Sequence, residues 1–302
     1  MGYQAVFKRY EIKYMITSQQ KETILRAMEP YMEPDRFGRS TIRNIYFDTD
    51  DYILARHSIA KPDFKEKLRI RSYERAEAKS TVFVELKRKY DHVVYKRRTG
   101  LSEEDAMKWM AGAAVKNADG SPQVANEIDW FLGTYKNLRP ALFLSYDREA
   151  FRMRKGQSGA ADFRVTFDEN ILCRDSDMSL RSEVYGERIL EPGMVLMELK
   201  CSGGIPMWMT EVLSEEHIYK TSFSKYGTAY KTMIFPQLEE EKKQLAAAAA
   251  VRMPEMPETA AANAPERRSA YEPRRHQRGG YGKHAKQHRH LHFGFGRQRA
   301  TA

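Results

Sequence analysis

The stretch Lys67-Leu-Arg-Ile-Arg-Ser-Tyr73 alternates cationic and apolar side chains. Because successive side chains of a β-strand point to opposite faces, Arg69 and Arg71 share one face, with Leu68 on the other. The same alternation occurs in residues 7–14 (FKRYEIKY), 81–89 (TVFVELKRK), 93–98 (VVYKRR), 163–168 (FRVTFD) and 195–200 (VLMELK). The sequence therefore predicts antiparallel strands with one charged and one apolar face.

The charged faces of these strands are rich in Arg and Lys. They group Arg9, Glu11 and Lys13, then Glu85 with Lys87, Lys96 with Arg98, and Glu198 with Lys200. For one strand alone, a charged face exposed to solvent is the ordinary interpretation. Its repetition favours a surface that binds a polyanion, because Arg and Lys both match phosphate oxygens. If the strands close into one barrel, its interior must hold water, carboxylates or a bound anion, since burying like charges in a dry site is costly.

Six motifs together resemble a known family. They are RYEIKY (residues 9–14), IYFDT (45–49), KLRIRSY (67–73), VELKRK (84–89), YDREAF (146–151) and MELK (197–200). Their order and spacing resemble the VTC domain, the polyphosphate polymerase module of the vacuolar transporter chaperone complex, over about residues 6–235. That domain is a triphosphate tunnel metalloenzyme of the CYTH-like superfamily. The resemblance implies an α+β fold, an antiparallel β-barrel that forms the triphosphate tunnel, with helices packed outside.

Helix starts are visible between the predicted strands. Thr17 and Gln20 form a candidate capping box, and Ser102 precedes two acidic residues that favour a helix N-terminus. Pro122 and Pro206 stand where two further helices begin. The apolar residues of these helices are predicted to pack against the outside of the barrel.

The resemblance implies that the protein is a metal-dependent polyphosphate polymerase. Such an enzyme transfers the γ-phosphate of ATP to a growing polyphosphate chain inside a basic tunnel and releases ADP. Two alternatives use the same lining: an inorganic or nucleoside triphosphatase, and a non-catalytic module that binds polyphosphate or an inositol polyphosphate. Glu198 argues against the binding module, because a mere anion trap gains nothing from a carboxylate in its interior.

Site residues follow from the matched motifs. The catalytic set implied by the resemblance is Lys13, Arg69, Arg71, Lys87, Lys200 and Glu198, and the phosphate-binding set is Arg9, Lys96, Arg98, Tyr146, Arg148, Arg164, Ser224 and Lys225. Glu198 is the preferred ligand of Mn²⁺ or Mg²⁺, which take hard oxygen donors. Glu11 and Glu85 either join it or neutralise neighbouring cations. Asp168 is expected to be a salt-bridge partner at the end of a strand.

One segment departs from the family pattern. The eukaryotic polymerase has K-F-S-K near the end of the domain, whereas this chain reads Ser222-Phe-Ser-Lys225. The first lysine is absent, and Lys220 is a candidate substitute. The missing lysine counts against polymerase activity more than against phosphate binding.

Composition divides the chain into a tunnel domain at residues 1–240 and a basic tail, rich in Ala, Gly and His, at 241–302. Residues 246–302 contain 11 Lys and Arg against 4 Glu, a net charge of +7 out of +10 for the whole chain, and five of the eight histidines. A segment with so few apolar residues is expected to be disordered. It is predicted either to bind polyanions such as polyphosphate or RNA, or to be an inert linker.

The remaining features concern the compartment. No apolar run approaches the length of a membrane span, and the N-terminus lacks the apolar region of a secretory signal. Cys173 and Cys201 form no metal-binding or redox motif and are expected to be reduced thiols. A cytoplasmic protein is therefore expected, with a membrane-protein partner as a candidate for handling the product.

Overall fold

A computed structural model describes residues 10–60, 62–90, 93–114, 122–156 and 162–251. Its strands are β1 (Tyr10–Thr17), β2 (Met32–Asp48), β3 (Phe64–Ser72), β4 (Thr81–Tyr90), β5 (Val93–Ser102), β6 (Arg139–Met153), β7 (Arg164–Arg174), β8 (Glu187–Arg188), β9 (Met194–Cys201) and β10 (Lys220–Thr221). Its helices are α1 (Ser18–Met28), α2 (Ile53–Ala60), α3 (Glu103–Met110), α4 (Pro122–Thr134), α5 (Met207–Glu215), α6 (Lys225–Ala229) and α7 (Phe235–Val251), with a π-helical turn, η1 (Tyr230–Ile234), before α7.

All the strand pairs that the structure describes are antiparallel, and they form one sheet in the order β10-β1-β9-β7-β6-β2-β3-β4-β5, with β8 beside β7. The predicted closed barrel is wrong, because β5 and β10 end the sheet without pairing to each other in the described residues. Side chains link regions distant along the sheet instead. The Lys87 ammonium lies 2.8 Å from a Glu11 carboxylate oxygen, and the Lys67 ammonium lies 2.9 Å from Ser224 Oγ. The sheet is therefore strongly curved but open.

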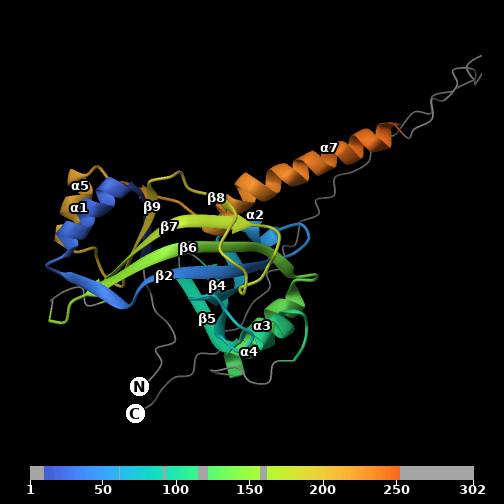
Figure 1. The fold of residues 1–302 in the computed structure, drawn as a ribbon, viewed down its shortest axis with the longest axis horizontal. Coiled ribbons are helices and arrows are strands. Elements are labelled where there is room, and N and C mark those ends of the chain that lie inside the picture. The colour runs from blue at the N-terminus through green and yellow to red at the C-terminus, as the bar shows by residue number, and fades with distance from the viewer. Residues whose placement is uncertain (1–9, 61, 91–92, 115–121, 157–161, 252–302) are drawn as a thin grey trace, which may run out of the picture. The chain divides into compact units, whose positions relative to one another are not determined.

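One end of the sheet is covered by α1 and α5, which lie together in Figure 1. Their apolar residues pack on the outward side chains of β1, β7 and β9, with Ile24, Phe167 and Met197 at the centre. The predicted capping box is confirmed: Thr17 Oγ1 accepts from the Gln20 amide, and the Gln20 side chain accepts from the Thr17 amide. This packing turns the charged residues of the three strands to the opposite face.

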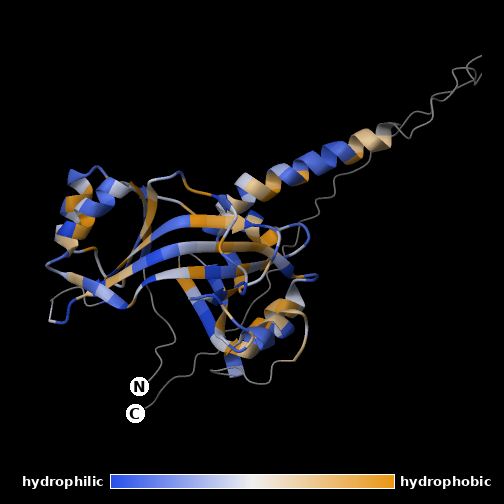
Figure 2. Ribbon diagram, viewed as in Figure 1, coloured by the Kyte–Doolittle hydropathy of each residue, from blue (hydrophilic) through white to orange (hydrophobic). Residues whose placement is uncertain are grey.

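A second apolar layer lies under α3 and α4. It contains Leu68 and Ile70 of β3, Trp109 of α3 and Phe131 of α4, all almost fully buried. Ser102 caps α3 as predicted, since its hydroxyl accepts from the Asp105 amide. Figure 2 shows that the strands carry both hydrophobic and hydrophilic residues, as the alternation in the sequence requires.

The third apolar cluster joins α2, α6 and η1 to the inner side of the sheet. Tyr226 stacks on Tyr46 at 4.6 Å between ring centroids and donates to Asp48 at 2.6 Å. The Asp48 carboxylate also accepts hydrogen bonds from the backbone amides of Leu54 and Ala55, and it therefore holds the start of α2 in place. These contacts fix the segment that leads into α6 against the concave face.

The chain leaves this unit through α7. Residues up to Ala250 form one compact unit, and residues 241–251, which the sequence assigned to the tail, belong to this helix. The rest of the predicted tail, residues 252–302, lies outside the described residues. No helix in the described part of the chain is both long and apolar enough to cross a membrane.

Candidate functional site

The concave face of the sheet encloses a cavity of about 970 Å³. Its lining includes every described residue of the predicted site except Glu85: Glu11, Lys13, Arg69, Arg71, Lys87, Lys96, Arg98, Tyr146, Arg148, Arg164, Glu198, Lys200, Ser224 and Lys225. Arg9 lies outside the described residues. The strands position most of these side chains by their alternation, because the outward residues between them are held in the apolar layers, and Ser224 and Lys225 come from the start of α6. Residues up to 214 positions apart in the sequence thus share one cavity.

Glu198 of β9 is the most densely paired carboxylate of the lining. Its oxygens lie 3.1 Å from Lys200, 3.4 Å from Lys13, 3.9 Å from Arg148 and 4.0 Å from Lys225. Burial alone would raise the pKa of Glu198, but the four cations outweigh burial and hold the pKa well below its usual range. Glu198 is therefore ionised and presents negative charge to an otherwise cationic cavity.

Asp168 lies behind this lining and is fully buried. It accepts two hydrogen bonds from Arg148, at 2.6 and 2.7 Å, and one from Lys225. The predicted salt bridge is confirmed, but its expected place is wrong, because Asp168 stands inside β7 and not at its end. Burial opposes ionisation of Asp168, yet Arg148 and Lys225 lower its pKa. The residue orients two of the cations that face the cavity.

Glu85 of β4 does not line the cavity, but it lies at the centre of a second cluster whose four cations do. Its side chain is 1% exposed and lies 2.7 Å from both Arg69 and Lys96, with Arg71 and Arg98 at 3.8 and 3.9 Å. Burial would raise its pKa, but Arg71, Arg69 and Lys96 lower it well below the usual range. Burial and the neighbouring Arg69 and Arg71 lower the pKa of Lys96 to about 8, although Glu85 opposes this shift. The geometry supports neutralisation of cations, one of the two roles expected for Glu85.

Two contacts tie the remaining predicted residues together. Glu11 and Lys87 form an ion pair at 2.8 Å between β1 and β4. Arg71 donates to the Tyr146 hydroxyl at 2.9 Å and to the Asn44 side chain at 3.0 Å. Burial would raise the pKa of Tyr146, but Arg148 and Arg71 lower it overall. Tyr146 therefore lies within the cationic cluster, on the same face as Arg148, as expected.

Lys67 was missed by the sequence interpretation although it lies two residues before Arg69 on the same strand face. Its ammonium donates to Ser224 Oγ at 2.9 Å and lines the cavity. Lys220, the candidate substitute for the absent lysine, lines the cavity from an exposed position on β10. Further lining residues that were not among the predicted site residues include Ser40, Tyr46, Lys65, Lys89 and Thr166. The period of two along each strand was the signal that could have identified Lys65, Lys67 and Lys89.

Carboxylates suited to a divalent cation are few in this cavity. Within the described ranges, no group of three or more His, Cys, Asp or Glu side chains is arranged to hold a metal ion. Four carboxylates line the cavity, those of Glu11, Asp35, Asp63 and Glu198, and of these Glu11 and Glu198 lie on the paired strands β1 and β9. Mg²⁺ is commonly held by one or two carboxylates together with phosphate oxygens. The donor set therefore fits a metal that is shared with a bound phosphate chain, and Glu85 is not part of that set.

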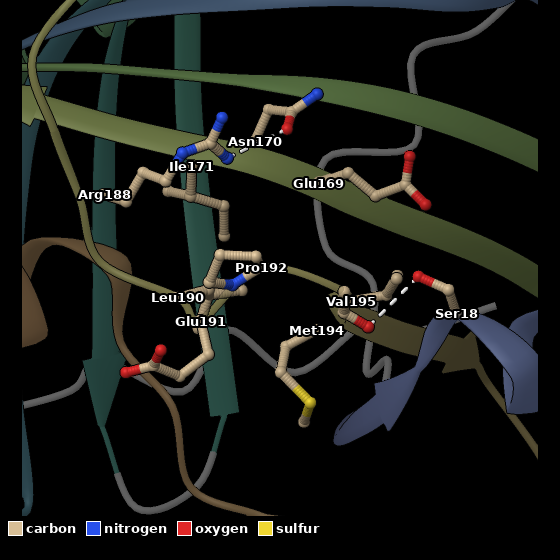
Figure 3. A pocket seen from close by; sticks show the side chains of 11 residues that line it. Ser18, Glu169, Asn170, Ile171, Arg188, Leu190, Glu191, Pro192, Met194 and Val195 are labelled. Atoms are coloured by element: carbon tan, nitrogen blue, oxygen red, sulfur yellow. Dashed lines mark hydrogen bonds between the residues drawn. The ribbon is translucent and has the colours of Figure 1, made fainter.

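A smaller cavity of about 170 Å³ lies elsewhere, between β7, β8 and the start of β9 (Figure 3). In it, Arg188 donates to the Asn170 side chain at 3.2 Å, and Ser18 Oγ donates to the Gly193 carbonyl at 3.1 Å. Its lining combines one Arg with the carboxylates of Glu169 and Glu191. None of the predicted site residues that the structure describes lines this smaller cavity.

Solved structures with partial similarity include a proposed adenylate cyclase from Bacillus halodurans, which is 16% identical with a TM-score of 0.43 and covers 73% of this chain and 96% of that one. Another proposed adenylate cyclase, from Vibrio parahaemolyticus, is 11% identical with a TM-score of 0.40, covering 72% of this chain and 95% of that one.

The sequence relationships are more informative. Vacuolar transporter chaperone complex subunit 4 from Trypanosoma brucei brucei is 23% identical over 281 aligned residues, which cover 76% of this chain and 35% of that subunit. The chain thus spans about a third of the curated relative that it matches. The sequence profile of the VTC domain matches residues 8–234, from the first predicted strand to the π-helical turn and across the whole cavity. The chain belongs to the VTC domain family.

Proposed function

We propose that the protein is a metal-dependent polyphosphate polymerase, which transfers the γ-phosphate of ATP to a growing polyphosphate chain in the large cavity. The observation that carries this proposal is the lining itself. Cations from β1, β3, β4, β5, β6 and β9 face one space together with the carboxylate of Glu198. Membership of the VTC domain family and the similarity to a vacuolar transporter chaperone subunit support a function that involves polyphosphate.

Phosphoryl transfer depends mainly on holding the phosphates in line and neutralising their charge. In the proposed reaction, an oxygen of the terminal phosphate of the chain forms a bond to the γ-phosphorus of ATP. The bond between that phosphorus and the β–γ bridging oxygen breaks, and ADP leaves with the electron pair. No proton needs to be transferred in this step, which is consistent with a lining dominated by permanent cations.

The arginine and lysine side chains of the lining differ in how they can bind the phosphates. Arg69 and Arg71 present planar guanidinium groups suited to two phosphate oxygens each, whereas Lys13, Lys87 and Lys200 act as mobile point charges. Arg148 is held by Asp168 through two hydrogen bonds, so its orientation is fixed before substrate binds. Preorganised charge of this kind stabilises the negative charge that spreads over the transferred group.

Mn²⁺ or Mg²⁺ would be held by Glu198, with Glu11 as a second carboxylate, and would supply positive charge that neutralises the bound phosphates. The cations around Glu198 keep it ionised, which is the form that binds a metal. Lys13 and Lys200 lie 3.4 and 3.1 Å from Glu198 and would have to move toward the phosphates when the metal binds.

The proposed partners are ATP and polyphosphate as substrates, and a membrane protein that handles the product. The similarity to a subunit of a complex supports the second part. We also propose a reducing compartment such as the cytoplasm, because Cys173 and Cys201 are both buried thiols.

Incubating the full-length protein with ATP and Mn²⁺, and separating long chains from free phosphate, tests the proposal. Polyphosphate and ADP are expected in the products. Release of inorganic phosphate without chains would indicate a triphosphatase instead. Tight binding of triphosphate without any turnover would indicate the non-catalytic module.

A further inference from the structure

Phe37 of β2 is an exposed aromatic residue in the lining of the large cavity. It is 55% exposed, whereas Tyr146 and Tyr226 of the same lining are buried. The cavity therefore reaches the surface at Phe37. An apolar ring that stays in contact with water gains nothing from the hydrophobic effect, so its position there is unfavourable unless a ligand covers it.

The backbone of β2 is irregular at this residue. Pro34 pairs with Phe151 of β6 and Arg39 pairs with Glu149, so residues 35–38 face a single residue of the neighbouring strand. Within this bulge, Gly38 has a φ of 55°, and the Asp35 carboxylate accepts a hydrogen bond from the Phe37 amide at 2.8 Å. Bulges redirect a side chain and occur often beside binding sites. The bulge therefore fixes the backbone of Phe37 at the opening of the cavity.

The ring of Phe37 is supported by a second aromatic ring. Tyr73 stacks against it, with 5.9 Å between ring centroids and 12° between ring planes. Tyr73 is itself held in place, because its hydroxyl accepts from Arg98 at 3.2 Å and its ring packs against the edge of Phe83 at 5.8 Å. The Phe37 ring is therefore oriented before a ligand binds.

A planar cation also lies over the Phe37 ring. The guanidinium carbon of Arg36 is 4.6 Å from the ring centroid, and Arg36 is exposed. Aromatic rings and guanidinium planes are the two groups on which proteins commonly stack nucleobases. Phe37 and Arg36 together therefore have the chemistry of a site for a nucleobase.

The position of this pair relative to the phosphate-binding residues fits a nucleotide. Tyr73 follows directly after β3, and Arg71 and Arg69 precede it on the same face of that strand. At about 3.3 Å per residue, they lie about 7 and 13 Å from Tyr73 along the strand. A nucleoside triphosphate whose phosphates contact these arginines can therefore extend its base toward Phe37. Inorganic triphosphate has no group that could reach this opening.

We propose that Phe37, supported by Tyr73, stacks on the adenine base of the ATP substrate, with the Arg36 guanidinium as a second stacking plane. This inference rests on the proposed function and adds to it the place where the nucleoside is held. Stacking uses the aromatic face that every base has. The subsite should therefore favour nucleoside triphosphates over inorganic triphosphate without selecting strongly among bases.

Isothermal titration of the full-length protein with ATP and, separately, with inorganic triphosphate tests the inference. Divalent metal is omitted so that no turnover occurs. The Phe37→Ala variant should bind ATP about tenfold more weakly, the loss that corresponds to one base stacked on an aromatic side chain. It should bind inorganic triphosphate within about twofold of the parent, because this ligand does not contact the ring.

Two further variants show whether the ring itself is responsible. Phe37→Trp keeps an aromatic surface and should bind ATP within about threefold of the parent. Phe64→Ala is the matched control, because Phe64 is also exposed, at 46%, but does not line the cavity. It should change neither affinity by more than about twofold.

The possible failures are distinguishable. If Phe37→Ala binds ATP as tightly as the parent, or loses affinity for ATP and inorganic triphosphate equally, this inference is overturned and the proposed function stands. The same holds if Phe37→Trp loses as much ATP affinity as Phe37→Ala. A loss of ATP affinity in Tyr10→Ala alone would also overturn it, because Tyr10 is the other lining aromatic of the described residues that is more than half exposed. If the parent itself does not bind ATP, the proposed function is overturned as well.

Discussion

Glu85 and Glu198 are both buried carboxylates surrounded by four cations, yet they occupy different regions of the molecule. Glu85 is 1% exposed and lies behind the lining, where it joins Arg69, Arg71, Lys96 and Arg98. Glu198 is 10% exposed at its side chain and forms part of the lining. The two carboxylates therefore have the same pattern of neighbouring charges but differ in their access to the cavity.

Access to the cavity determines what each carboxylate can do. A carboxylate closed off from the cavity can only compensate the charge of its neighbours, which is the condition for burying those cations at all. A carboxylate on the lining can also contact a metal or repel a phosphate. Substitutions at the two centres should therefore change different properties of the protein.

The largest effect is expected for Glu85→Gln. The amide leaves Arg69, Arg71 and Lys96 without a compensating charge in a buried site, so the free energy of unfolding should fall by about 3 to 5 kcal/mol. Denaturant titration measures this change. Glu11→Gln is the matched control, because Glu11 pairs with one half-exposed lysine and its loss should cost about 1 kcal/mol or less. If the two variants lost equal free energy of unfolding, Glu85 would not be the carboxylate that makes the burial of these cations possible.

Glu198→Gln should lower turnover strongly and stability only slightly. Turnover with ATP and Mn²⁺ should fall at least about 100-fold, or about 2.7 kcal/mol of transition-state stabilisation, because the metal-binding charge is lost. The free energy of unfolding should change by less than half of the Glu85→Gln value, since Asp168 still compensates Arg148 and Lys225. Binding of triphosphate without metal should persist or tighten. More than half of parental turnover at saturating metal would exclude Glu198 as the essential ligand.

Arg69→Ala tests a cation that belongs to both the cavity lining and the Glu85 cluster. Arg69 lines the cavity and also donates to Glu85 at 2.7 and 2.9 Å. Triphosphate should bind about 1 to 3 kcal/mol more weakly, the range for a charge-assisted hydrogen bond. Stability should fall less than in Glu85→Gln, because Glu85 keeps Arg71 and Lys96. Unchanged affinity in a titration calorimeter would show that Arg69 serves only the framework.

The pH dependence of binding gives a smaller but specific signal. The pKa of Lys96 is lowered to about 8, so this residue is charged below that pH and neutral above it in the empty cavity. Triphosphate favours the charged form, and affinity should therefore decline as the pH rises above about 8, by up to about tenfold per pH unit for one proton. Lys96→Arg should remove this part of the decline. A parental affinity that is constant between pH 7 and 9.5 is the contrary outcome.

Removal of residues 252–302 should have the smallest effect on chemistry. The cut falls after α7, and the cavity lies entirely in the preceding residues. Turnover of short substrates should stay within about twofold, whereas retention of long polyphosphate at low salt should weaken, because the removed segment carries a net charge of +7. Retention on a size-exclusion column measures this. Equal retention with and without the segment would leave it as a linker.

Much of the fold could be predicted because strand alternation and helix caps are local signals. The six charged stretches correspond to β1, β3, β4, β5, β7 and β9, and the four predicted helix starts are those of α1, α3, α4 and α5. The two longest strands, β2 and β6, were indicated only by short motifs. Their inward residues include Ile42, Tyr46 and Leu144, which pack against α6 and lack the charged alternation. Barrel closure could not be judged, because it depends on pairing between strands that no local pattern encodes.

The structure brings the predicted residues to one cavity where a motif specified the strand face. Two positions could not be predicted from the sequence for physical reasons. Alternation placed Glu85 on the inner face correctly, but it could not show that four cations cover the carboxylate and remove it from the lining. Lys67 lies in the stretch 67–73, but its contact with Ser224 depends on the packing of α6, which no local pattern in the sequence encodes.

The location of Mn²⁺ in a crystal soaked with inorganic triphosphate tests the central claim most directly. Anomalous scattering identifies the metal independently of the surrounding density. The expected result is a peak at the Glu198 carboxylate, bridged to triphosphate in the large cavity, and no peak at Glu85. A peak at Glu85, or triphosphate bound in the smaller cavity beside Arg188, would contradict the assignment of Glu198 as the functional carboxylate.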